Sequence, residues 1–297
     1  MTTTSSVTRV KYWLQGEAKQ NLGDSIAELF IQRLNRGYRV SAGAYRLLGS
    51  CIDDWQIGED LAGLAEGDRV AYWGCGLREE RAIAPALMSR CIILGVRGPL
   101  TRTLLGLPED TVLGDPALIL PLLHAPAART DTTGHSICIP HFNDSRDDAA
   151  LLDLAGTERI VRPVVEPGLD SLLKVIDQIA TARFVLSASL HGAIVAAAYG
   201  RPFAFWDNGH LDLPLKWRDF AASIGVSCAF VPNAADAAAA YGALIRPKIK
   251  LPRLSPILNV CPLNVPPSLM LRALAWDGVL SDANARPSIE ALEACGK

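Results

Sequence analysis

The segment from Phe184 to Asp207, FVLSASLHGAIVAAAYGRPFAFWD, contains the residue types that proton transfer to an anionic substrate requires. Its first residues, Phe184–Leu186, form an apolar run that predicts a buried strand, and the turn after it contains Ser187 and Ser189. His191 follows in the same turn, and an alanine-rich helix is expected to begin just after it, at Ala193. In an open α/β sheet, ligands bind at the carboxyl ends of strands, and a helix N-terminus there offers N–H groups to an anion. A histidine in such a turn is well placed to donate or accept a proton near neutral pH.

Further polar residues follow other apolar runs of the chain, in the same relation to an expected strand. They are Asn21, Gly23 and Asp24; Gly74, Cys75 and Gly76; Arg97 and Arg102; Gly114 and Asp115; and His141, Asn143 and Asp144. If the sheets are parallel, these turns share the carboxyl edge of their sheet, and two facing domains would bring them together across a cleft. Carboxylates, arginines and histidines would then converge without being adjacent in sequence, as in an active site.

Each of these residues also has a purely structural interpretation. His191 could be a hydrogen-bonded core histidine, and Asp24 and Asp115 could be helix caps. Arg97 and Arg102 could be solvated surface charges. The joint pattern, rather than any single residue, favours a functional site.

Strand and helix patterns alternate along the chain without a hairpin signal, which predicts an α/β protein with parallel sheets. The expected strands are Val10–Leu14, Arg69–Trp73, Cys91–Val96, Val112–Leu113, Ser136–Ile139, Arg159–Val165, Phe184–Leu186, a run from Phe203, and Val226–Val231. The expected helices are Ser25–Leu34, Pro99–Leu105, Leu169–Ala180, Ala193–Tyr199 and Ala234–Ile245. A linker rich in Pro, Ala, Thr and Gly, at about 125–134, marks a domain boundary. We therefore expect two Rossmann-like domains facing a cleft, at residues 1–128 and 129–246, followed by a tail, 247–297, that the sequence does not place.

The composition argues against several classes of protein. The chain has 297 residues, of which 49% are hydrophobic, and a formal net charge of −2, so it lacks the basic balance of a nucleic-acid-binding protein. Its first residues lack the apolar core of a signal peptide, and no window approaches the length of a membrane-spanning helix, so we expect a cytoplasmic protein. The seven cysteines are scattered without a CxxC pair, which argues against a zinc site or a disulfide framework. The dinucleotide-binding GxGxxG pattern and the P-loop pattern are both absent.

Taken in order, the polar turns resemble those of the polysaccharide pyruvyltransferase family, and most closely the ketal pyruvate transferases of bacterial exopolysaccharide synthesis, the xanthan type among them. The matching pieces are Asn21-Leu22-Gly23-Asp24, Gly74-Cys75-Gly76, Val96-Arg97-Gly98-Pro99 with Thr101-Arg102, Gly114-Asp115-Pro116, Ile139-Pro140-His141-Phe142-Asn143, and Ser187 through Pro202. They span about residues 10–207, and the Ser-Leu-His-Gly block followed by Gly-x-Pro is the most specific.

The resemblance implies a fold like that of the GT-B glycosyltransferases. It also implies transfer of a pyruvyl group from phosphoenolpyruvate to two hydroxyls of one sugar, which makes a cyclic ketal. This chemistry needs cations and N–H donors for the donor's carboxylate and phosphate, a general acid for its methylene carbon, and a general base. It needs no metal or redox cofactor, so we expect phosphoenolpyruvate as a donor substrate and no cofactor. The acceptor is expected to be a saccharide, free or lipid-linked, and a lipid-linked acceptor would bring the protein to the inner face of the membrane.

On this interpretation His191 and Asp24 are the catalytic residues, with Asp24 helping to activate the attacking hydroxyl. The expected donor-binding residues are Arg97, Arg102, Ser187, Ser189, Gly192 and His141, and the expected acceptor-binding residues are Asn21, Asp115 and Asn143. Several family members carry arginine where this chain has Ser189, whereas the xanthan-type branch also has serine there. Another cation must then meet the donor's charge, and we expect Arg97 and Arg102 to do so.

Two other functions stay open on the sequence. A GT-B glycosyltransferase that uses a nucleotide sugar would have the same fold class, because a fold does not fix a function. A non-catalytic module that binds a sugar or an anion is the second alternative, and Ser189 in place of the arginine favours it. Release of UDP or GDP, release of phosphate from phosphoenolpyruvate, and binding without turnover distinguish the three.

Overall fold

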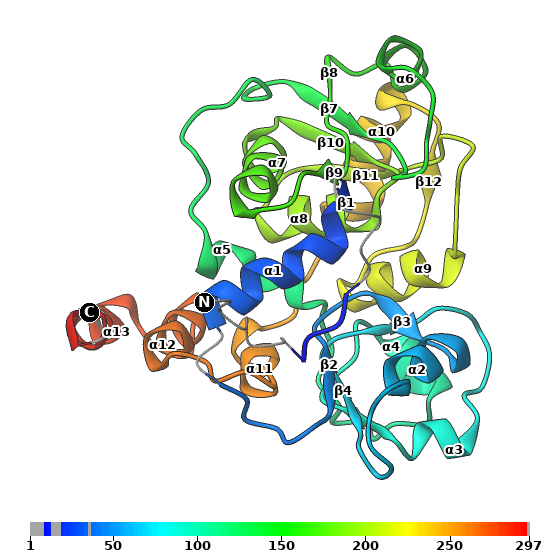
Figure 1. Ribbon diagram of the computed structural model, residues 1–297. Helices are drawn as coiled ribbons and strands as arrows, with labels where there is room; N and C mark the ends of the chain where they lie inside the picture. Colours follow the sequence, from blue (N-terminus) through cyan, green and yellow to red (C-terminus); the bar gives the residue numbers. More distant parts are fainter. Residues whose placement is uncertain (1–8, 13–18, 35–36, 296–297) are drawn as a thin grey trace, which may run out of the picture.

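The structure is a computed structural model that describes residues 9–12, 19–34 and 37–295. Parallel strands form the centre of each half of the chain, and helices surround them (Figure 1). The expectation of an α/β protein with parallel sheets is therefore confirmed. The finer expectation of two Rossmann-like domains in a GT-B arrangement stays a prediction.

The larger sheet belongs to the second half of the chain and has five parallel strands in the order β12-β11-β10-β7-β8. Its strands are β7 (Ser136–Ile139), β8 (Arg159–Ile160), β10 (Phe184–Ser187), β11 (Phe203–Trp206) and β12 (Phe230–Val231). In the central strand β10, Val185 pairs with Ile137 of β7 and with Phe203 of β11. These three strands are buried on both faces, which explains their unbroken apolar sequences. The helices of this half are α6 (Asp148–Ala155), α7 (Leu169–Thr181), α8 (Leu190–Ala198) and α10 (Ala234–Ala240), which the π-helical turn η2 (Tyr241–Ile245) continues.

The two sheets formed within the first half consist of short parallel strands. One sheet has the order β2-β4-β6, and a second pairs β3 with β5. The strands are β2 (Ala44–Arg46), β3 (Ser50–Ile52), β4 (Val70–Tyr72), β5 (Gly76–Leu77) and β6 (Cys91–Ile93), and the helices are α2 (Asp54–Leu61), α3 (Pro85–Met88) and α4 (Pro99–Leu104). The predicted runs Arg69–Trp73 and Cys91–Val96 thus contain β4 and β6, whereas the sequence analysis missed β2, β3 and α2.

Packing crosses between the halves in both directions. Near the start of the chain, β1 (Gln20–Asn21) pairs with β9 (Val164–Val165), and α1 (Leu22–Leu34) packs on α7 and α8, beside the upper sheet of Figure 1. The 3-10 turn η1 (Pro116–Ile119) and α5 (Leu120–Leu123) also pack on α8. Three helices from later in the chain pack on elements of the first half: α9 (Pro214–Ser223) packs on α4, α11 (Leu254–Asn259) on η1, and α12 (Pro267–Trp276) on α5. The last helix, α13 (Asp282–Cys295), packs on α12.

One apolar core contains buried side chains from both halves of the chain and from the tail after residue 246. It includes Phe30, Trp73, Ile176, Phe205 and Ile257. The tail after residue 246, which the sequence left unplaced, therefore docks onto both halves, and the indole N–H of Trp73 donates to the carbonyl of Ile257 at 2.9 Å. Elements before residue 128 pack against elements after it. The division of the chain into two domains at that residue stays a prediction.

The expected single strand Arg159–Val165 is wrong, since the structure has two strands there. β8 joins the parallel sheet, and β9 leaves it to pair antiparallel with β1. Pro163 lies between them and has no N–H to continue the sheet ladder, while its carbonyl accepts from the N–H of Leu22. Of the expected strand Val10–Leu14, Val10 bridges Tyr45 in a parallel sense, and its last two residues lie outside the described residues.

The buried carboxylate of Asp219 joins α9 to the start of α4. Its Oδ1 accepts from the N–H groups of Leu100 and Thr101 at 2.9 and 3.1 Å, and its Oδ2 accepts from the Thr101 hydroxyl at 2.7 Å. The guanidinium Nε of Arg97 lies 3.6 Å from the same carboxylate, and both side chains are fully buried. Asp219 thus supplies the cap that Gly98, the N-cap residue of α4, cannot provide. A Cβ at Gly98 would lie 2.1 Å from the carbonyl oxygen of Asp219, so the close approach requires glycine.

Replacing Asp219 by asparagine tests this junction. Asn keeps the shape of the side chain and one acceptor oxygen, but it leaves the Arg97 charge buried without a counter-charge, which typically lowers the free energy of unfolding by about 3–5 kcal/mol. Chemical denaturation measures the change, with Asp153→Asn on the exposed face of α6 as the matched control. Equal stability of the two variants would contradict the junction.

Candidate active site

A cavity of about 360 Å³ is lined by both halves of the chain. Of the residues singled out from the sequence, it brings together Asn21, Asp24, His141, Asn143, Ser189 and His191. Its lining also includes polar residues that the sequence analysis did not single out: Arg46, Ser50, Arg78, Asp212 and Lys216. The convergence of separate turns on one site is thus observed for the turns that follow β7 and β10 and for the start of α1.

His191 lies in the first turn of α8, which begins directly after β10 and the turn residue Ser189. Its side chain is 12% exposed, and its Nε2 lies 3.7 Å from Oδ2 of Asp115. Neither of these two atoms has a hydrogen-bond partner among the described residues. The ring also packs against α1, where a Cβ at Gly23 would lie 2.2 Å from the imidazole Nδ1. Glycine at position 23 therefore allows α1 to approach the histidine.

The environment of His191 favours its neutral form. Burial lowers the pKa of the imidazole below its ordinary value, and the positive charges of Arg97 and Lys216 act in the same direction. The carboxylates of Asp115 and Asp24 oppose this shift and raise the pKa, but they do not reverse it. A neutral imidazole can accept a proton, and the two carboxylates would then stabilise the imidazolium.

Asp115 combines a capping role with its contact to the histidine. It is the N-cap residue of η1, and its Oδ1 accepts from the N–H of Ala117 at 2.9 Å. Its other oxygen faces His191, and the side chain is fully buried. Asp115 therefore lies behind the histidine and does not line the cavity, where the sequence analysis expected it to bind the acceptor.

His141, Asp212 and Lys216 form a second charged group in the cavity wall. Lys216 Nζ lies 2.5 Å from Asp212 Oδ1, and His141 Nε2 lies 3.4 Å from Asp212 Oδ2. Because His141 Nδ1 accepts from the N–H of Asn143 at 3.2 Å, Nε2 carries the proton and points to the carboxylate. Burial alone would raise the pKa of Asp212, but His141 and Lys216 hold it well below its usual range. Burial lowers the pKa of Lys216, an effect that Asp212 opposes.

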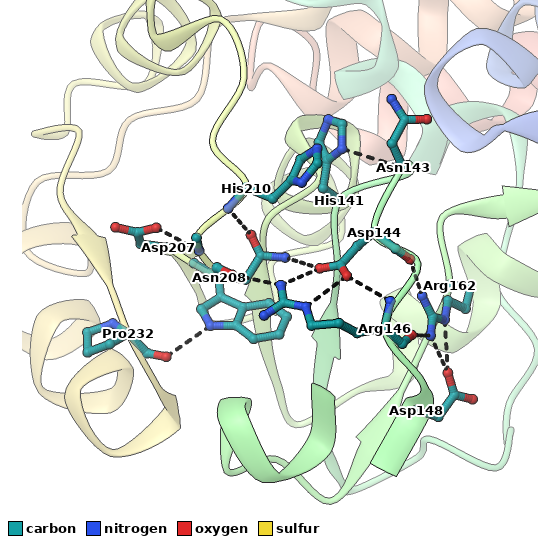
Figure 2. A network of polar contacts seen from close by, with 12 residues as sticks. His141, Asn143, Asp144, Arg146, Asp148, Arg162, Asp207, Asn208, His210 and Pro232 are labelled. Atoms are coloured by element: carbon teal, nitrogen blue, oxygen red, sulfur yellow. Dashed lines mark hydrogen bonds and ion pairs between the residues drawn. The ribbon is translucent and has the colours of Figure 1, made fainter. Parts of the chain in front are cut away.

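A network of polar contacts, in which Asp144 and Asn208 are buried, holds the loop that bears His141 (Figure 2). The carboxylate of Asp144 accepts from Arg146 at 2.9 and 2.5 Å and from the side-chain amide of Asn208 at 2.8 Å. The hydrogen bonds from Arg146 hold the pKa of Asp144 below its ordinary value. The network joins the loop after β7 to the loop after β11, and the rings of His141 and His210 stack between these loops with centroids 4.6 Å apart.

The remaining predicted residues do not line the cavity. Arg97 is fully buried behind it and donates to the hydroxyl of Ser50, a lining residue, at 2.7 Å. Arg102 points elsewhere and donates to the carbonyl of Glu109 at 2.6 Å. The Ser187 hydroxyl donates to the Ser189 carbonyl at 2.7 Å and so shapes the turn before α8.

Gly192 is likewise behind the cavity. It lies on the side of α8 that packs against Ser187 and Ile139, and both of these residues are fully buried. This packing requires a small residue at position 192. The role of Gly192 in donor binding stays a prediction.

The sequence analysis missed four charged lining residues: Lys216, Asp212, Arg78 and Arg46. Asp212 and Lys216 follow the predicted strand at Phe203, in the same strand–turn–helix relation as His191. Pro214 could have indicated the helix that bears Lys216, because proline is common in the first turn of a helix. Arg78 follows β5, which is too short to be recognised from apolar periodicity.

Neither a metal-binding cluster nor a membrane-spanning helix is found in the described part of the chain. No three His, Cys, Asp or Glu side chains within it are grouped so that they could hold a metal ion. None of the helices described is both long and apolar enough to cross a membrane.

The pKa of His191 can be tested by following its imidazole resonance by NMR as the pH is changed. We expect titration below the ordinary value of about 6.5. Asp115→Asn keeps the cap on η1 but removes a charge that raises the pKa, so the variant should titrate at still lower pH. Asp110→Asn, at an exposed position, is the control. An unchanged or higher pKa in Asp115→Asn would contradict the electrostatic pairing.

Comparison with known proteins agrees with the resemblance seen in the sequence. The family model described as Polysaccharide pyruvyl transferase matches residues 47–210, more than half of the chain, a range that includes His141 and His191. A curated relative, the succinoglycan biosynthesis protein ExoV of Rhizobium meliloti (strain 1021), is 28% identical over 137 residues, which make up 46% of this chain and 41% of that protein. The match therefore spans less than half of the relative's length. No solved structure matches the chain. The chain belongs to the polysaccharide pyruvyl transferase family.

Proposed function

We propose that the chain transfers a pyruvyl group from phosphoenolpyruvate to two hydroxyls of one sugar in a saccharide acceptor and so forms a cyclic ketal. The observation that carries this proposal is the cavity, whose lining combines a histidine with a lowered pKa, a lysine, an arginine and the carboxylates of Asp24 and Asp212. Family membership supports the reaction class, and the residues of the cavity supply the groups that the reaction needs.

The donor carries a carboxylate and a phosphate, so its site requires positive charge. Lys216 and Arg78 line the cavity, and the first turn of α8 adds the N–H groups and the positive dipole end of a helix. We propose that these two cations meet the donor's charge, in the role for which the sequence suggested Arg97 and Arg102. Arg97 contributes from behind, through its field and through Ser50.

His191 is proposed to carry the proton from acceptor to donor. The neutral imidazole takes the proton of the sugar hydroxyl, and the imidazolium gives it to the methylene carbon as the hydroxyl oxygen bonds to C2. The electron pair of the C2–C3 double bond forms the new C–H bond of the methyl group, so no carbanion is left. The C2–O–phosphate bond breaks, the electron pair leaves with phosphate, and the second hydroxyl closes the ketal and gives its proton to the released phosphate. Asp115, whose Oδ2 lies 3.7 Å from Nε2, stabilises the imidazolium from behind by its negative charge.

Asp24 is proposed to orient the acceptor. It lines the cavity at the start of α1, and its Oδ2 accepts from the side-chain amide of Asn21 at 2.7 Å. A carboxylate in this place can accept hydrogen bonds from sugar hydroxyls, and an ionised one can also help to remove a proton.

The reaction is tested by incubating the protein with phosphoenolpyruvate and a panel of free and lipid-linked saccharides. We expect acceptor-dependent release of phosphate, in equal amount to a new ketal methyl signal in the NMR spectrum of the saccharide. Release of UDP or GDP from a nucleotide sugar would contradict the proposal and support a glycosyltransferase. Binding of phosphoenolpyruvate without turnover across the panel would support a binding module instead.

Lys216→Gln tests the assignment of the donor-binding cation. Hydrogen bonds to charged groups contribute about 1.5–3 kcal/mol, so the KM for phosphoenolpyruvate should rise roughly 10- to 100-fold. The KM for the saccharide should change much less. Lys174→Gln, at an exposed position of α7, is the matched control. An equal rise in both KM values would argue against donor binding by Lys216.

His191→Gln tests the proton carrier. Loss of a general acid–base typically lowers kcat by about two to four powers of ten, whereas Gln can still fill the site and accept hydrogen bonds. His135→Gln, at the opposite end of β7 from His141, serves as the control for loss of a histidine. A folded His191→Gln protein with near-normal kcat would exclude the proposed role.

A further inference from the structure

A second cavity of about 210 Å³ adjoins the first. The two share Trp55 and Arg78 in their linings, so a ligand that fills the first cavity can extend past these side chains into the second. The second cavity continues along the segment after β5, where Glu79 and Arg81 line it. Both are exposed, and they offer hydrogen-bond acceptors and donors to a ligand that arrives from solvent.

Trp55 is unusually exposed for its size. It lies in the first turn of α2, and 66% of its surface is accessible to solvent. Its backbone is fixed, because the preceding Asp53 caps α2 by accepting from the N–H of Gln56 at 2.6 Å, and Asp54 accepts from the N–H of Ala84 at 2.8 Å. The exposed indole lines both cavities, so it is available to a ligand that passes from one to the other.

The chemistry of the groove fits a sugar ring. One face of a pyranose presents C–H groups and packs on a flat aromatic ring, while the hydroxyls at its edge need polar partners. Tryptophan provides a large contact area with few rotatable bonds, so little conformational entropy is lost when it binds. The charged side chains of Glu79 and Arg81 line the same cavity as the indole and can bond to the hydroxyls.

The volume of the first cavity also indicates that a longer saccharide needs a binding surface outside it. At about 360 Å³ it is near the lower end of the range for ligand pockets, about 300–1,000 Å³. Phosphoenolpyruvate together with the sugar that receives the pyruvyl group fills a space of this order. The neighbouring sugars of a polysaccharide must then lie outside it, and the second cavity is directly adjacent.

We propose that the groove around Trp55 is a subsite for a further sugar of the acceptor saccharide, with the indole stacked on the C–H face of that ring. The inference rests on the proposed function for the identity of the ligand. The second cavity would then bind the part of the saccharide that lies beyond the sugar that reacts, so longer acceptors would bind more tightly.

Binding of saccharides in the absence of phosphoenolpyruvate tests the subsite. The probes are oligosaccharides of increasing length, from a single sugar to a tetrasaccharide, prepared by acid cleavage of succinoglycan, and calorimetry measures their affinity. The wild-type protein should bind the tetrasaccharide more tightly than the single sugar. Trp55→Ala should weaken tetrasaccharide binding roughly tenfold, which corresponds to about 1.4 kcal/mol, and should remove most of the advantage of length. Trp276→Ala is the matched control, because Trp276 is the other strongly exposed tryptophan among the described residues and lies on α12.

Two results would overturn the subsite: equal tetrasaccharide binding by Trp55→Ala and Trp276→Ala, or a wild-type protein that binds the tetrasaccharide no more tightly than the single sugar. Because no donor is present, these results are independent of turnover. Absence of phosphate release in the separate assay with phosphoenolpyruvate would contradict the proposed function while leaving a length-dependent, Trp55-dependent affinity intact.

Discussion

The carboxylate of Asp219 accepts three hydrogen bonds from the start of α4 and lies beside the buried guanidinium of Arg97. A charge removed from water in this way is stable only with its partners in place, so α9 has one permitted position against the first half of the chain. Lys216 is three residues earlier on α9 and therefore lies on the same face of the helix. The contact that joins the halves thus also sets the place of the lysine in the cavity wall.

Much of the central fold was predictable, because long apolar runs bounded by turns are a strong signal. The strand Ser136–Ile139 was predicted with its observed bounds, and the helix Leu169–Ala180 ends one residue short of α7. The crossing of α1 and of the tail between the halves was not predictable, since a helix shows in its sequence which face is apolar but not which sheet covers it. Likewise, Pro163 divides β8 from β9, and the partner of β9 lies far away at the start of the chain.

For the site, the sequence indicated residues that follow well-formed strands, and His141 and His191 indeed line the cavity. It could not separate lining residues from the residues behind them. Arg97 and Asp115 follow strands as His191 does, yet their charged groups are buried against Asp219 and against the imidazole. Such placement depends on contacts between segments that are distant in sequence, and the same contacts bring Lys216 to the cavity without a local motif. Family comparison has the same limit, because the matched residues end before Lys216.

The proposed roles of His191 and Lys216 require phosphoenolpyruvate to bind in this cavity. A crystal structure of the protein with phosphoenolpyruvate tests this most directly. We expect the phosphate or the carboxylate within hydrogen-bond distance of Lys216 Nζ, and the methylene carbon on the side of the cavity that bears His191. Phosphoenolpyruvate bound outside this cavity, or bound in it with both anionic groups turned away from Lys216 and Arg78, would contradict the account.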